Sequence, residues 1–132
     1  DNSRKTGQLN NSLNNLQTLC YLCHAIAHGL KISIKNPKII LPDTADENSH
    51  VWHLFVTRTE DRDAFQKHLT DNGVGSLIHY PIPPHKQPAY KEWANESYPL
   101  SEQIHKEVLS LPLHNALTKD EVETIIKVCN RY

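Results

Sequence analysis

The segment Cys20-Tyr-Leu-Cys23-His24 has a spacing that could do chemistry. Two cysteines followed directly by histidine form the attachment pattern of a c-type haem, with the histidine as an iron ligand. The sequence offers no export signal and no methionine as a second axial ligand, so we do not expect haem. His28 could add a fourth ligand for zinc, but four ligands on one rigid helix rarely converge tetrahedrally. We therefore interpret Cys20 and Cys23 as a cysteine pair on an apolar helix face and predict no metal site.

A second group of polar side chains flanks a rigid turn. His79 and Tyr80 end an expected strand, directly before a stretch with three prolines at positions 81–84. A rigid turn can hold such side chains toward a ligand, so we predict that His79 and Tyr80 bind substrate. Packing of the turn is the alternative role for both. His85 and Lys86 follow the turn and could add charge to the same rim.

The elements that position these residues start with a helix. Leucines at positions 9, 13, 16, 19, 22 and 30, together with Ile26, recur mostly at intervals of three or four. This spacing predicts one helix with an apolar stripe. The chain changes character near Lys31, and residues 35–42 predict a short extended piece between prolines.

The next part of the chain predicts strand, helix and strand. Residues 50–58 alternate, with Trp52, Leu54 and Val56 on one face, as in a strand with one face in the core. His50 and His53 then point to opposite faces, so they should not share a metal. Residues 61–72 predict a helix that Gly73 ends. Residues 74–80 predict a second strand.

The last third of the chain predicts three helices. Residues 81–84 exclude regular structure because proline fixes the backbone and removes donors. Helices are expected around residues 88–94 and 101–109. Thr118-Lys-Asp-Glu121 is a capping box that opens a final helix. Trp52, Phe65 and Trp93 are expected in the core. Strands separated by helices predict an α/β or α+β fold, with helices covering a small sheet.

Composition narrows the class of protein. Hydrophobic residues make up 38% and charged residues 22%, as in a globular protein. The net charge of −1 gives no reason to expect nucleic acid or an anionic membrane as a partner. No segment is apolar enough for a membrane span, and three cysteines favour a reducing, cytoplasmic compartment over a disulfide scaffold. The chain contains no methionine, and we expect it to be a piece of something longer.

The motif Leu77-Ile-His-Tyr-Pro-Ile-Pro-Pro-His-Lys-Gln-Pro-Ala-Tyr90 closely resembles the C-terminal domain of the DegT/DnrJ/StrS family of sugar aminotransferases. Residues 34–42, 51–58, 109–113 and 118–121 resemble further family segments in the same order. The resemblance covers residues 34–132, which would form the small C-terminal domain of a fold type I aminotransferase. Within the family, the sequences of these motifs are most similar to those of enzymes that aminate a dTDP-linked 3-keto-6-deoxyhexose.

The resemblance implies a homodimer that uses pyridoxal phosphate, a sugar nucleotide and an amino donor, expected to be glutamate. A lysine of the large domain would form the Schiff base, and the cofactor would act as electron sink. That lysine would lie upstream of this chain. We therefore expect no catalytic residue here, and no cofactor bound by this chain alone. By the same resemblance, His79 and Tyr80 would approach the hydroxyls or phosphates of the sugar nucleotide.

Residues 1–33 depart from the family pattern. Asn2-Ser3-Arg4 resembles a motif whose asparagine reaches the cofactor phosphate of the neighbouring subunit, so Asn2 and Arg4 are candidate cofactor contacts. The family continues with a charged helix, whereas residues 6–30 carry no charge. A segment that departs from the family, lying between two segments that resemble it, suggests a compensated pair of frameshifts or a substituted segment. The encoding DNA would test this hypothesis.

Two functions follow from these patterns. The first is a truncated or degenerate nucleotide-sugar aminotransferase that retains the substrate-side small domain. The second is a non-catalytic module that self-associates through the apolar stripe between Leu9 and Leu30, because an exposed stripe of this kind needs a partner.

Overall fold

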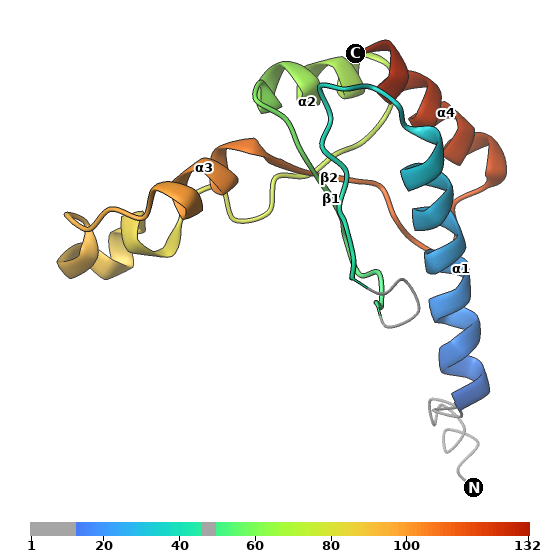
Figure 1. The fold of residues 1–132 in the computed structure, drawn as a ribbon, viewed down its shortest axis with the longest axis horizontal. Helices are drawn as coiled ribbons and strands as arrows, with labels where there is room; N and C mark the ends of the chain where they lie inside the picture. The colour runs from blue at the N-terminus through green and yellow to red at the C-terminus, as the bar shows by residue number, and fades with distance from the viewer. Residues whose placement is uncertain (1–12, 46–49) are drawn as a thin grey trace, which may run out of the picture.

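The computed structural model describes residues 13–45 and 50–132, with side chains described from residue 23 onward outside the gap. The described elements follow one another along the chain (Figure 1): α1 (Leu13–Ser33), β1 (Phe55–Arg58), α2 (Arg62–Asp71), η2 (Pro84–Lys86), η3 (Pro88–Trp93), α3 (Pro99–Glu107), β2 (Val108–Leu111) and α4 (Lys119–Arg131). No helix in this part of the chain is long and apolar enough to cross a membrane.

The sheet is small and antiparallel. β1 pairs with β2, with Phe55 opposite Leu111 and Arg58 opposite Val108. Single bridges extend it on both sides, from Ile40 to Arg58 and from Leu77 to Ser110. Helices α1, α2 and α4 gather at one end of this sheet (Figure 1). The predicted fold class, a small sheet covered by helices, is confirmed.

The core lies between the sheet and these three helices. α1 contributes Ala27 and Leu30, which are one turn apart and fully buried. α2 contributes Phe65 and Leu69, at the spacing that the sequence predicted. α4 contacts both α1 and α2. Its buried residues are Ile125, Val128 and Cys129.

Two predicted helix signals, Gly73 and the Thr118–Glu121 box, are confirmed, and the structure adds a cap at Asp61. The Asp61 carboxylate accepts a hydrogen bond from the backbone N–H of Ala64 and caps α2. Gly73 has a φ of 76° just beyond the end of α2, a conformation that favours glycine. Thr118 and Glu121 form the reciprocal capping box of α4.

The first predicted strand starts later than expected. A bend at His53 shifts the alternation, so that Phe55 and Thr57 are the buried residues of β1, while Leu54 and Val56 are half-buried. Thr57 is tolerated there because its hydroxyl donates to the carbonyl of Leu109 at 2.8 Å. Trp52 is buried before the bend, as predicted.

The predicted strand at residues 74–80 is wrong. Leu77 alone pairs with Ser110, through one hydrogen bond in each direction. The chain then bends at His79, and Tyr80 adopts a φ of 53°, which takes the backbone out of the sheet. The partner of β1 is instead β2, because the helix expected at residues 101–109 ends at Glu107 and its last residues extend.

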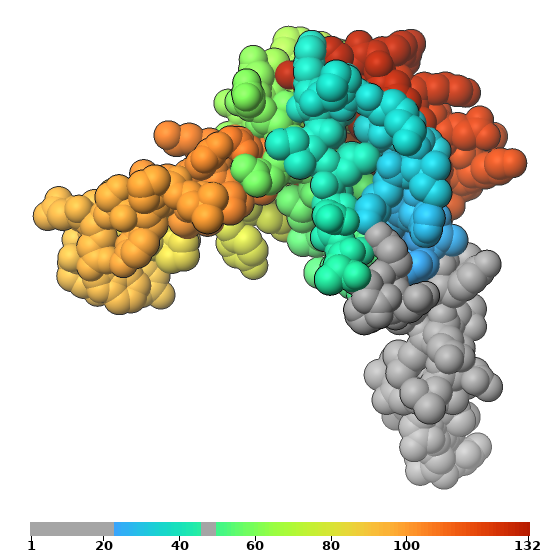
Figure 2. Space-filling view, viewed as in Figure 1, coloured from blue at the N-terminus to red at the C-terminus, as the bar shows by residue number. Residues whose placement is uncertain are grey.

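Residues 81–107 form an arm that stands off from the rest of the described chain (Figure 2). It contains η2, η3 and α3. Of residues 80–100, all described, only Pro83 and His85 are buried. The prediction that Trp93 belongs to the core is therefore wrong. Trp93 is 44% exposed and stacks on Tyr90 with ring centroids 4.8 Å apart, because so short an arm cannot enclose a core of its own.

Candidate functional site

His79 lies beside the outer edge of β2. Its Nδ1 atom is 2.8 Å from the hydroxyl of Ser110, a buried residue of β2. The bridge between Leu77 and Ser110 aligns the backbone before His79 with β2. The side chains of His79 and Ser110 are therefore brought together. The contact fixes one ring nitrogen of His79 and leaves Nε2 for another partner.

A cavity of about 310 Å³ opens next to this pair, and we call it the His79 cavity. Leucines from the start of β1, from the bridge and from the end of β2 form much of its wall. Its polar lining comes from His53, Ser76, His79 and Ser110. The Ser76 hydroxyl is buried and has no hydrogen-bond partner among the described residues. Such a group costs free energy unless something binds it.

Tyr80 follows His79 but does not line this cavity. The residue is 77% exposed, and its φ of 53° marks the point where the chain leaves the sheet for the arm. A non-glycine residue in this region carries backbone strain, a feature that occurs at binding sites. Tyr80 is therefore available to a ligand outside the cavity.

His85 and Lys86 lie in the arm, where His85, Trp93 and Tyr98 help to line a different cavity of about 460 Å³. The buried His85 ring places Nε2 2.9 Å from the carboxylate of Glu102. This hydrogen bond is the main cause that lowers the pKa of Glu102 below its usual value.

Lys86 also has structural partners within the arm. Its ammonium donates to the main-chain carbonyls of Ala94 and Glu96, at 2.9 and 2.8 Å. The sequence predicted one rim for His79, Tyr80, His85 and Lys86. The structure instead places His79 in one cavity and His85 in another.

The other predicted positions contribute less to this site. Asn2 and Arg4 lie outside the described residues, as does the side chain of Cys20. The rings of His24 and His28 are 6.2 Å apart, and Cys23 is half-buried. Within the described residues, no group of three or more histidine, cysteine, aspartate or glutamate side chains could hold a metal ion.

Sequence reasoning missed Ser76 and Ser110 as parts of the site. Ser110 lies between two leucines of β2, and Ser76 lies in the segment predicted as a strand. No sequence pattern identified Ser110, because its contact with His79 joins positions 31 residues apart and depends on the pairing at β2. No pattern pointed to Ser76, because its position depends on the bend after Leu77.

A third cavity, also of about 310 Å³, lies at the start of α4 and is lined in part by Asp120, Glu121 and Thr124. Glu121 already serves the capping box. The lining of this and of the other two cavities contains no lysine. A Schiff base with pyridoxal phosphate requires a lysine amine beside the cofactor, so the residues around these cavities do not fit that cofactor.

Comparison with known proteins places this geometry in a family. The profile of the DegT/DnrJ/EryC1/StrS aminotransferase family matches residues 10–130. The chain is 56% identical over 99 residues to the dTDP-3-amino-3,6-dideoxy-alpha-D-galactopyranose transaminase of Aneurinibacillus thermoaerophilus, covering 75% of this chain and 27% of the relative. It is 34% identical over 122 residues to the 3-oxo-glucose-6-phosphate:glutamate aminotransferase of Bacillus subtilis (strain 168), covering 88% of this chain and 27% of the relative.

The fold agrees with these sequence matches. The crystal structure of S. venezuelae DesV in complex with ketimine intermediate superposes with a TM-score of 0.83 and 35% identity, over 90% of this chain and 33% of that one. The chain therefore spans about a quarter to a third of the length of these relatives. The family match begins at residue 10 and includes α1, a longer range than the resemblance noted from residue 34. The agreement of sequence profile, relatives and fold shows that this chain belongs to the DegT/DnrJ/EryC1/StrS aminotransferase family.

Proposed function

We propose that this chain is the substrate-side small domain of a nucleotide-sugar aminotransferase. The whole reaction would transfer an amino group from glutamate to a keto-deoxy sugar nucleotide. The names of the two relatives support the two halves of this proposal, a dTDP-linked amino sugar in one and glutamate as donor in the other. The observation that carries it is the His79 cavity, whose wall includes a histidine held in place by Ser110.

The family depends on pyridoxal phosphate, which supplies an electron sink when it is bound. We propose that the lysine for its Schiff base lies outside this chain. Three of the described lysines have other partners, which supports this view. Lys67 pairs with Asp71 at 2.6 Å, and Lys127 pairs with Glu123 at 3.6 Å. Lys86 holds the arm together.

The proposed role of His79 is to bind a hydroxyl or phosphate oxygen of the substrate. Where the Ser110 hydroxyl donates to Nδ1, the ring carries its hydrogen on Nε2 and can donate it to the substrate. We propose that Tyr80 approaches the same ligand from outside the cavity, and its exposure supports this role. His85 and Lys86 stay predicted substrate contacts that would first have to leave their partners in the arm.

Borohydride trapping tests the absence of cofactor chemistry. The purified chain is mixed with pyridoxal phosphate, reduced with borohydride, and mapped by mass spectrometry for a modified lysine. We expect no stoichiometric adduct at any single lysine of a folded chain. One specific adduct would contradict the proposal and identify the Schiff-base lysine. A stable dimer that binds no sugar nucleotide would instead support the alternative of a self-association module.

Binding of a dTDP-linked sugar tests the role of His79. Titration calorimetry or NMR should detect binding to the chain, and the variant His79→Ala should weaken it about tenfold, as expected for a hydrogen bond to a charged group. His114→Ala is the matched control because His114 is exposed and lines none of the three cavities. Equal binding by both variants would contradict the proposed role.

A further inference from the structure

We infer that the cavity in the arm binds the quaternary ammonium group of a small organic cation, such as choline. This cavity of about 460 Å³ is the one that His85 helps to line, and we call it the arm cavity. It shares no lining residue with the His79 cavity, so the inference does not depend on the proposed function. Aromatic walls, their fixed positions and the surrounding charge carry it.

Aromatic rings form much of the wall of the arm cavity. Trp93, Tyr98 and the buried ring of His85 line it. Trp93 is 44% exposed and Tyr98 is 50% exposed, so a ligand from solvent can reach both rings. The face of an indole or phenol ring carries negative potential and attracts a cation that lies over it. A quaternary ammonium offers no hydrogen-bond donor, so aromatic faces suit it better than a shell of acceptors.

Contacts within the arm hold these rings in place. Tyr90 stacks on one face of Trp93, with ring centroids 4.8 Å apart and ring planes within 6° of parallel. Tyr90 does not line the arm cavity, so the opposite face of Trp93 stays open to a ligand. The rings of His85 and Tyr98 meet edge to face, with centroids 4.9 Å apart. Walls that are already fixed reduce the entropy cost of binding.

The charges around the arm cavity favour a cation. Glu96 lines the cavity, and its carboxylate accepts a hydrogen bond from the hydroxyl of Tyr98. That hydrogen bond, and then the negative charge of Glu96, raise the pKa of Tyr98. Glu102 adds a second carboxylate, 2.9 Å from the ring of His85. The ammonium of Lys86, held by backbone carbonyls of the arm, offsets only one of the two carboxylates. The surroundings of the cavity therefore stay negative.

Other classes of ligand fit the arm cavity less well. An anion would meet the carboxylate of Glu96, and the described residues that line the cavity include neither lysine nor arginine to hold it. A primary ammonium is compact and strongly hydrated, so it loses more on leaving water than a quaternary one. A neutral molecule of the same shape gains nothing from the ring faces or from the carboxylate. Comparison of a cation with its neutral isostere is therefore the decisive measurement.

Tryptophan fluorescence of the whole chain tests the inference with choline as the probe. Trp52 is buried and Trp93 is exposed, so a ligand in the arm cavity should change mainly the emission of Trp93. At constant ionic strength, choline should bind at least about tenfold more tightly than the alcohol in which a carbon atom replaces its nitrogen. Only the cation gains from the rings and from Glu96. Equal binding of the two, or no change of emission with choline, would overturn the inference.

Variants of Glu96 test the contribution of charge. Glu96→Gln keeps a hydrogen-bond acceptor for Tyr98 but removes the negative charge, so it should weaken choline binding about threefold. Glu92→Gln is the matched control, because Glu92 is an exposed residue of η3 that does not line the cavity. Equal affinities of these two variants would mean that the carboxylate of Glu96 does not hold the cation.

Variants of Trp93 test the aromatic wall, with saturation transfer to the methyl protons of choline as the NMR readout. Trp93→Phe keeps a ring that attracts cations less strongly, and Trp93→Leu keeps only an apolar side chain. Affinity should fall in that order, by about tenfold in Trp93→Leu. Wild-type affinity in Trp93→Leu would overturn the inference. The proposed function would be unaffected, because lysine mapping and sugar-nucleotide binding by His79→Ala decide it separately.

Discussion

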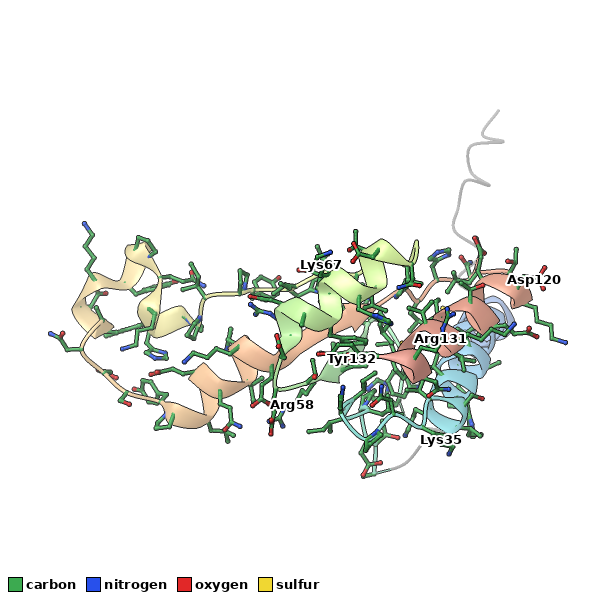
Figure 3. All side chains as sticks on the ribbon, turned by 90° about the horizontal axis from the view of Figure 1, so that it is seen from above. Lys35, Arg58, Lys67, Asp120, Arg131 and Tyr132 are labelled. Carbon is green, nitrogen blue, oxygen red and sulfur yellow. The ribbon has the colours of Figure 1, made fainter. Side chains whose placement is uncertain are left out.

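Arg58 on β1 donates two hydrogen bonds to one carboxylate oxygen of Glu107, from Nε at 3.0 Å and from Nη2 at 2.7 Å. Glu107 is the last residue of α3, and β2 begins at the next residue. The pair therefore lies where the arm joins the sheet, and Figure 3 labels Arg58 at this junction. Hydrogen bonds from Gln103 and then from Arg58 lower the pKa of Glu107.

Breaking this pair should loosen the junction. We expect Glu107→Gln to lower the free energy of unfolding by about 1–2 kcal/mol, because a half-buried charged hydrogen bond is lost. Urea denaturation measures the change. Lys67→Met is the matched control, since it breaks an ion pair whose side chains are 74% and 56% exposed and should cost less than about 0.5 kcal/mol. Equal effects of the two variants would show that the junction pair does not stabilise the domain.

The same pair predicts a dependence of stability on pH. The folded-state pKa of Glu107 is below its usual value of 4.5. Ionised Glu107 therefore stabilises the fold fully above that usual value, and the contribution is lost as pH falls through the lower folded-state pKa. Wild-type stability should fall more steeply below pH 4.5 than that of Glu107→Gln. Parallel curves for the two proteins would contradict the pKa shift.

Leu30 tests whether α1 is an integral part of the domain. The side chain is fully buried in the core. Leu30→Ala should therefore cost about 2–5 kcal/mol through lost burial and a residual cavity. Ile32→Ala is the control on the same helix, because Ile32 is 55% exposed and should cost less than about 1 kcal/mol. A small effect of Leu30→Ala would mean that α1 packs only loosely on the rest of the chain.

The elements predicted correctly from sequence are those with local signals. Helical spacing, Gly73 and the Thr118–Glu121 box identified α2 and α4, since these signals act within a few residues of the element they bound. The strands were harder, because their pairing is set at long range. A bend at His53 and the bridge at Leu77 determine which residues enter the sheet, and no local sequence pattern predicts either feature.

Only part of the site was predicted, again because some of its contacts are set at long range in the sequence. The position of His79 at the end of a pairing segment, before a rigid turn, was visible in the sequence. Its contact with Ser110 joins positions 31 residues apart and depends on the sheet register. His85 was expected on the same rim, but the prolines direct the arm away from the sheet, and His85 turns inward to Glu102.

Gly73 and Gly29 should respond to alanine with opposite signs. Gly73 has a φ of 76°, where a side chain adds strain, so Gly73→Ala should lower stability by about 1–2 kcal/mol. Gly29 lies inside α1, and a Cβ there would meet nothing within 4 Å. Gly29→Ala should raise stability by about 0.5–1 kcal/mol, because alanine is the better helix former. Thermal unfolding of both variants measures the pair, and a loss of stability in Gly29→Ala would contradict the path of α1.

Cys129 should resist thiol reagents until the domain unfolds. The residue is fully buried on α4, and burial raises the pKa of its thiol to about 12. The thiolate is the reacting form, so both its scarcity and its inaccessibility slow modification. At pH 8, iodoacetamide should label Cys129 at least about a hundredfold more slowly than the half-buried Cys23. Peptide mapping by mass spectrometry distinguishes the two cysteines, and urea should remove the difference because it exposes both. Rapid labelling of Cys129 in native buffer would instead mean that α4 opens readily, and that the core formed by α1, α2 and α4 is not held as the structure has it.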